Sequence, residues 1–132
     1  MITYLWIAVG GALGSVARFA CSNLALAWFG PSFPWGTLAI NVIGSFVIGA
    51  FAGVTGPDGR FLVSGDVRQF VLVGICGGYT TFSSFSLQTL TLAQDGAYLR
   101  AGWNIVGSVV LCLIAVWLGW IAAAAVNAVK GG

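Results

Sequence analysis

One apolar segment, residues 68 to 93, limits the possible folds of this chain more than any other feature. It is long enough to cross a bilayer, yet its middle reads GICGGYTTFSSFSLQTLT (residues 74–91), with three glycines followed by seven Ser and Thr hydroxyls. Lipid cannot satisfy free backbone N–H and C=O groups, so an interrupted helix at this depth has to be enclosed by protein or by a polar cavity. The facing ends of two half-helices can hold a cation through carbonyls and an anion through N–H groups. We therefore expect a broken third span that forms a transport site.

The composition indicates an integral membrane protein. The 132 residues are 59% hydrophobic and 6% charged, whereas a soluble domain carries roughly 25% charged residues. A helical span takes about 20 residues, so we expect an all-α fold with one membrane domain over residues 1–132 and spans at about 3–28, 35–56, 68–93 and 102–126. The N-terminus has no basic region or cleavage site, which predicts a retained helix. Four helices hardly enclose a lined pathway, so we expect an oligomer in the lipid, most simply a dimer.

Two polar side chains in the first two spans each have two interpretations. Arg18 lies about two-thirds of the way along the first span, where a charge is costly unless it snorkels or faces a wet cavity. It either reaches the nearer interface or stands at the mouth of an anion vestibule. Asn41 begins a stripe that recurs every four residues through Ser45 to Gly49 and Gly53. Its amide either joins helices or lines a pathway as a donor. In the first span, Gly10, Gly11 and Gly14 predict a face for close helix contact.

The chain beyond the glycines has a polar face and an aromatic face. Thr81, Ser84, Gln88 and Thr91 recur at helical spacing and predict a hydroxyl and amide track. Phe82 and Phe85 lie on a neighbouring face; such a pair is usually packing, but beside a polar track its positive ring edges can meet an anion. A weaker stripe follows in the fourth span, formed by Asn104, Ser108 and Cys112.

Missing residue types exclude several functions. The chain has no His and no Glu, and its acids, Asp58, Asp66 and Asp95, all fall in loops. Proton-coupled carriers and cation pumps normally need an intramembrane carboxylate or His, so the spans are better suited to a small anion. No nucleophile is paired with a base, so we do not expect an enzyme. The three cysteines show no metal-type spacing and are interpreted as small core residues. A net charge of +2 is too small to imply nucleic acid.

The positive charges give no clear orientation in the membrane. With four spans, both termini share one side with the middle loop, and this side collects Arg60, Arg68 and Lys130. The other side collects Arg100 and, if it snorkels that way, Arg18. Three against two is no meaningful bias under the positive-inside rule. A chain of this kind can insert in both orientations, which allows an antiparallel dimer.

Three motifs together resemble the Fluc-type (CrcB) fluoride channels over essentially the whole chain: GGALGSVARF, GTLAINVIGSFVIG and GICGGYTTFSSFS. The resemblance implies antiparallel, dual-topology homodimers of four-helix subunits with two fluoride pores. It also implies passive export of fluoride across the cytoplasmic (inner) membrane, which protects against fluoride toxicity, and a structural sodium ion, Na+, at the two-fold axis.

The resemblance also implies residue roles. The backbone carbonyls of Gly77 and Thr80 would bind the sodium ion. The fluoride pathway would include the pore residues Asn41, Phe82 and Phe85, the hydroxyl track, and the vestibule arginine. In this sequence the track residues are Thr81, Ser83, Ser84 and Ser108, and the arginine is Arg18. Asn104 and Cys112 depart from the family pattern, which has hydroxyl side chains there.

Two rival functions fit less well. A small multidrug transporter needs an acid in its first span, and this chain has none there. A structural assembly subunit would explain the glycine faces. It would not explain the run of hydroxyls or the embedded Arg18.

Overall fold

The computed structural model describes residues 1–130, over which every regular element is helical. Three continuous helices are α1 (Ile2–Phe29), α2 (Trp35–Val54) and α6 (Tyr98–Lys130). The third span is composite, running from Gly65 to Gln94, and all four are long and apolar enough to cross a membrane. The expectation of four apolar spans with an interruption in the third is confirmed.

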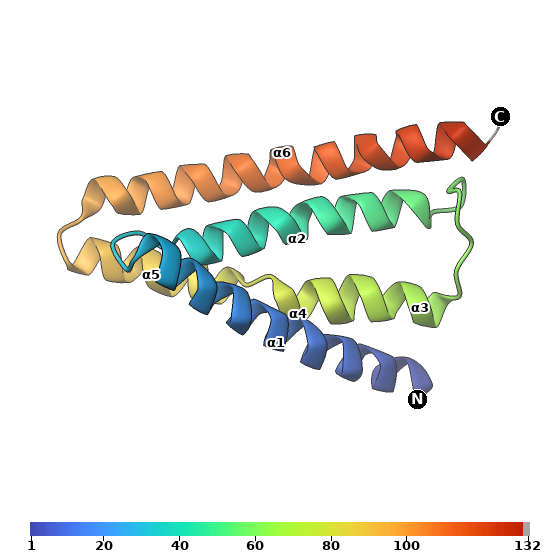
Figure 1. Cartoon of the computed structure of the whole chain (residues 1–132), viewed down its shortest axis with the longest axis horizontal. Coiled ribbons are helices and arrows are strands. Elements are labelled where there is room, and N and C mark those ends of the chain that lie inside the picture. Colours follow the sequence, from blue (N-terminus) through green and yellow to red (C-terminus); the bar gives the residue numbers. More distant parts are fainter. Residues whose placement is uncertain (131–132) are drawn as a thin grey trace.

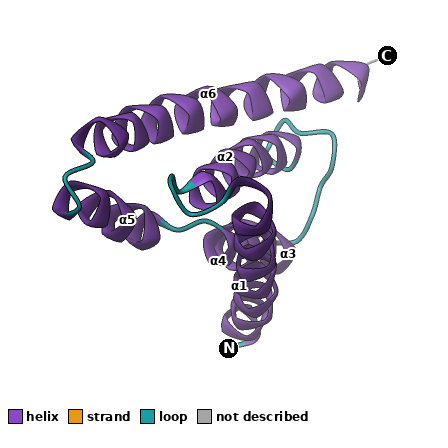
Figure 2. Cartoon of the chain, turned by 60° about the vertical axis from the view of Figure 1, so that its left-hand side comes forward, coloured by secondary structure: helices purple, strands orange, loops and turns teal. Residues whose placement is uncertain are grey.

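The helices pack as two pairs joined through the third span. α2 lies along α6, and α1 crosses the first part of the third span (Figure 1). The second part of that span, α5 (Phe82–Gln94), packs on α6 instead. Figure 2 shows the two parts of the third span diverging, with α1 beside one and α6 beside the other. Both termini lie at the same end of the bundle, as an even number of spans requires (Figure 1).

The interruption falls at two threonines, not at the glycines that precede them. The first part of the third span comprises α3 (Gly65–Gln69), a π-helical stretch η1 (Phe70–Cys76) and α4 (Gly77–Tyr79). All three glycines of the motif are therefore helical. Thr80 (φ −83°, ψ 158°) and Thr81 (φ −153°, ψ 112°) are extended. Thr81 then caps α5, because its hydroxyl accepts a hydrogen bond from Ser84 N.

Two glycines of the third span, Gly74 and Gly78, allow close packing against α1. A Cβ atom on Gly78 would lie 2.6 Å from the Gly11 carbonyl oxygen, and one on Gly14 would lie 2.8 Å from Tyr79 N. These distances leave no room for any side chain, so the backbones of the two helices touch. The expected small-residue face of the first span is confirmed, and its partner is the first part of the third span.

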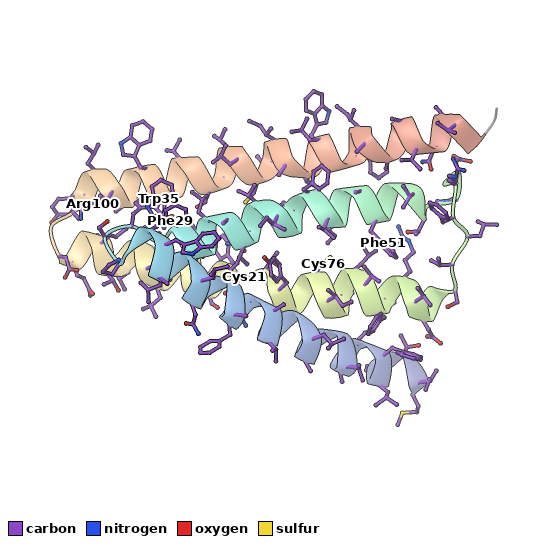
Figure 3. The ribbon with its side chains drawn as sticks, viewed as in Figure 1. Cys21, Phe29, Trp35, Phe51, Cys76 and Arg100 are labelled. Carbon is purple, nitrogen blue, oxygen red and sulfur yellow. The ribbon has the colours of Figure 1, made fainter. Side chains whose placement is uncertain are left out.

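The two ends of the bundle are closed by different contacts. At the end with the termini, Arg68 donates to Thr55 Oγ1 (3.2 Å), and Asn127 Nδ2 donates to the Gly53 carbonyl (3.1 Å). At the other end, Phe29 and Trp35 lie together beside the 30–34 turn, near Arg100 (Figure 3). Such aromatic rings suit the level of the lipid headgroups.

Candidate functional site: the interrupted third span

Two side chains replace the helical hydrogen bonds that are lost at the interruption. In a continuous α-helix Thr81 N would donate to the Gly77 carbonyl, and Phe82 N would donate to the Gly78 carbonyl. Instead Thr81 N donates to Asn41 Oδ1 (2.8 Å), and Arg18 Nε donates to the Gly78 carbonyl (3.0 Å). Side chains thus satisfy two of the backbone groups that the interruption frees, Thr81 N and the Gly78 carbonyl, as their depth in the membrane requires.

The Asn41 side chain forms hydrogen bonds with both polar backbone groups, N–H and C=O, of a single residue, Thr81. Besides accepting from Thr81 N, its amide donates through Nδ2 to the Thr81 carbonyl (3.1 Å). The interpretation as a contact between helices is therefore correct for this amide. The side chain also lines a cavity, described below, so the second interpretation, a donor in a pathway, stays a prediction.

Arg18 is bound to the interruption and does not snorkel. Its side chain is half-buried, and its Nε reaches the Gly78 carbonyl, 60 residues away in sequence. That carbonyl belongs to the C-terminal end of α4, where a positive charge is favourable. The snorkelling interpretation is wrong because this carbonyl, freed by the missing Phe82 N–H, offers a partner within the membrane. Arg18 does not line the cavity beside the interruption.

The backbone at Gly77 and Thr80 fits a cation. Thr81 N is diverted to Asn41, so the Gly77 carbonyl lacks its usual helical donor. Gly77 is exposed on the surface of the chain and Thr80 is half-buried. Carbonyl oxygens suit hard cations, and within residues 1–130 no group of three or more His, Cys, Asp or Glu side chains offers another metal site. The freed Gly77 carbonyl is thus compatible with carbonyl ligation of a hard cation, and the sodium site itself stays a prediction.

A cavity of about 380 Å³ adjoins the interruption, between α2, the third span and α6. Its polar lining comes from all three elements, and its walls are otherwise apolar. Predicted site residues that line it are Asn41, Gly77, Thr80, Thr81, Phe82, Phe85 and Ser108. The cavity thus brings together most of the residues that the sequence singled out, from segments far apart in the chain.

The two phenylalanines contact each other at this cavity. Their ring centroids are 5.3 Å apart and their planes meet at 54°. Phe85 is 9% exposed, whereas Phe82 is 78% exposed and projects from the chain. Both rings line the cavity, and the edge of a phenyl ring is its positive part.

The predicted hydroxyl track is divided. Ser84 Oγ lies 3.1 Å and Ser83 Oγ 3.3 Å from Thr81 Oγ1, so the three hydroxyls form a cluster at the start of α5. Of these residues Thr81 lines the cavity, whereas Ser83 and Ser84 do not. Gln88 and Thr91 line a second cavity, of about 420 Å³, near the 30–34 turn. The Oε1 atom of Gln88 is buried and has no hydrogen-bond partner among the described residues.

A chain of hydrogen bonds behind Phe85 includes Asn104, a residue for which the sequence predicted no role. Asn104 Nδ2 donates to Thr89 Oγ1 (2.9 Å), and Thr89 Oγ1 donates to the Phe85 carbonyl (2.7 Å). Ser108 Oγ lies 3.4 Å from Asn104 Oδ1, and Asn104 is 1% exposed. The four-residue spacing of Asn104 and Ser108 is the sequence feature that could have predicted these contacts. It places both on one face of α6, which here supports α5.

Comparisons with known proteins agree on one family. The family model described as CrcB-like protein, Camphor Resistance (CrcB), matches residues 5–120. A protein of Opitutus terrae named fluoride-specific ion channel FluC is 62% identical over 131 residues, covering 99% of each chain. A Rhodospirillum rubrum protein of the same name is 64% identical over 126 residues, covering 96% of this chain and 98% of the relative.

Proposed function

The chain belongs to the CrcB family, and we propose that it forms a fluoride-specific channel in the membrane. The observation that carries the proposal is the cavity at the interrupted span, where Asn41, Phe85 and Ser108 converge from three elements. Its relatives carry the name of a fluoride-specific ion channel, and a channel of this family is not an enzyme.

Weak and multiple contacts would conduct the ion. Fluoride is small and strongly hydrated, so a pore has to replace its water along the path without binding it tightly. In this proposal the Asn41 amide, the Thr81 and Ser108 hydroxyls and the ring edges of Phe82 and Phe85 supply such contacts. Ser83 and Ser84 lie at the N-terminus of α5, where N–H groups and the helix dipole favour an anion. Arg18 adds positive charge on the far side of the interruption.

Flow through this pathway would be passive. Asp58 and Asp95 lie in loops, whereas Asp66 lies in the first turn of the third span, where it accepts a hydrogen bond from Thr3 Oγ1. The expectation that all three acids fall in loops is therefore wrong for Asp66. The residues that line the cavity include no acid, Lys or Arg. The cavity therefore offers no carboxylate or His to carry a proton during transport. The protein would then export fluoride down its gradient across the cytoplasmic (inner) membrane and limit its toxicity.

The working unit would be an antiparallel homodimer that shares a sodium ion. The freed carbonyl at Gly77, exposed on the surface of one chain, supports this arrangement. In the dimer the carbonyls of Gly77 and Thr80 from both chains would bind the cation. The cation would offset the repulsion between the converging backbone dipoles and raise the local potential for anions.

The test is fluoride efflux from liposomes that contain the purified protein and a potassium gradient. Passive flow of fluoride carries charge, so efflux is expected to begin only when valinomycin lets potassium move as well. Efflux without the ionophore would instead indicate proton-coupled, electroneutral transport. Vesicles that retain fluoride in both conditions would refute the proposed channel.

A further inference from the structure

Two of the three free cysteines line the cavity beside the interruption. Cys76 comes from η1 and is 3% exposed, whereas Cys112 comes from α6 and is half-buried. Both lie among the cavity-lining residues, and Cys21 does not. Cys21 instead accepts a hydrogen bond from Tyr79 OH (3.4 Å). The sequence predicted that all three cysteines are small core residues. The structure distinguishes Cys76 and Cys112 from Cys21, because these two line the same cavity.

We propose that this cavity is a binding site for a soft, thiophilic metal ion, held by Cys76 and Cys112. Thiolates select soft metals, whereas the hydroxyl, amide and carbonyl groups around them suit hard ions. The pair is therefore the only soft donor set among the residues that line the cavity. With about 380 Å³ of space and mostly apolar walls, the cavity can admit a neutral linear species such as HgCl₂.

Binding proceeds by exchange of ligands with no change of oxidation state. The half-buried Cys112 thiol reacts first: its sulfur binds mercury, one chloride leaves and the thiol proton goes to solvent. The Cys76 thiol then displaces the second chloride and releases a second proton. The product is a neutral S–Hg–S bridge between η1 and α6.

The bridge has a consequence for conduction, and this part rests on the proposed function. Asn41 and Phe85 line the same cavity as the two thiols. A mercury atom there occupies the space that fluoride would cross and ties the first part of the third span to α6. Fluoride efflux should therefore stop, and a dithiol should restore it by removing the metal.

The first test measures binding alone, so it is independent of whether the protein conducts. Purified protein is treated with one equivalent of HgCl₂ and its intact mass is measured. The parent and the matched control Cys21→Ser should gain one mercury, lose two protons and retain no chloride. Cys76→Ser and Cys112→Ser should not form this bridged product. Because two linked bonds act as a chelate, removal of mercury from the parent should need about 100-fold more mercaptoethanol than removal from either cavity variant.

The second test measures efflux, with each variant compared with its own untreated rate. HgCl₂ should block the parent and Cys21→Ser alike, and it should block Cys112→Ser far less. If the parent forms only a chloride-retaining adduct, or if Cys21→Ser loses the bridged product, the site is refuted. Block of Cys112→Ser at the same concentration as the parent would also refute it. A parent that forms the bridge but never conducts would contradict the proposed channel and leave the metal site standing.

Discussion

Asn41 donates to and accepts from the same backbone residue, and this determines what its substitution must do. In Asn41→Asp the carboxylate can still accept from Thr81 N, but the donor to the Thr81 carbonyl is lost. Losing a partner of a buried polar group costs about 1–3 kcal/mol, and the new negative charge repels an anion in a low-dielectric cavity. We expect lower thermal stability and strongly reduced fluoride efflux from liposomes.

Asn127→Asp is the matched control for this substitution. It also removes an amide donor to a backbone carbonyl, that of Gly53, but it lies at the loop end of the bundle. Its efflux should match that of the parent. If Asn41→Asp conducts as well as the parent, Asn41 is a structural contact only and has no place in the pathway.

The phenylalanine pair gives a second prediction at the scale of single residues. Isoleucine keeps an apolar side chain but removes the positive ring edge, so Phe82→Ile and Phe85→Ile should each abolish fluoride efflux while the protein still purifies as a folded dimer. Phe19→Ile serves as the control because Phe19 is 68% exposed on α1 and does not line the cavity. Unchanged efflux in both variants would mean that the rings only pack against each other.

Sequence spacing predicted some contacts of the site and missed others for a physical reason. Phe82 and Phe85 are three residues apart on one helix, so local periodicity was enough to place them together. The contact of Arg18 with Gly78 joins residues 60 apart and depends on how α1 crosses the third span. A local sequence pattern does not show how two helices cross. The sequence therefore predicted the depth of the Arg18 guanidinium along its span but not its hydrogen-bond partner.

At the scale of elements, the glycine motif predicted an interruption but misplaced it. A glycine provides either conformational freedom or room for a neighbouring backbone, and the sequence of one helix cannot tell these apart. Here Gly74 and Gly78 give room for α1 and remain helical. The extended residues are Thr80 and Thr81, whose polar groups are held by the Cys76 carbonyl and by Asn41.

The contact between α1 and the third span can be tested with two glycines of the same helix. A Cβ on Gly14 would overlap the Ile75 carbonyl, whereas a Cβ on Gly11 would meet nothing within 4 Å. Forcing extra atoms into a packed contact typically costs about 1–3 kcal/mol. Gly14→Ala should therefore unfold at a lower temperature than the parent in detergent, with Gly11→Ala unchanged. Equal unfolding temperatures for all three proteins would show that the helices separate easily at this point.

At the scale of the whole molecule, the position of Arg18 alters the count of charges that orient the chain. Arg18 is held at the interruption, so it belongs to neither side. The side with the termini then carries three positive side chains, those of Arg60, Arg68 and Lys130, and the other side carries one, that of Arg100. The difference is two positive charges, a modest bias under the positive-inside rule. Under the proposed antiparallel dimer, Arg100 becomes the residue that keeps the second orientation accessible.

This gives the prediction on which the antiparallel arrangement depends. A reporter tag on the C-terminus should detect the parent in both orientations. Arg100, in the first turn of α6, is the only positive side chain of residues 95–100. Arg100→Gln should therefore drive the chain into one orientation, with both termini in the cytoplasm. Chains of one orientation cannot form antiparallel pairs, and fluoride efflux should be lost. Asp95→Asn controls for a change at the same end of the bundle, because it leaves the positive charges intact and should keep both orientations. A parent found in one orientation that still conducts would require a parallel dimer instead.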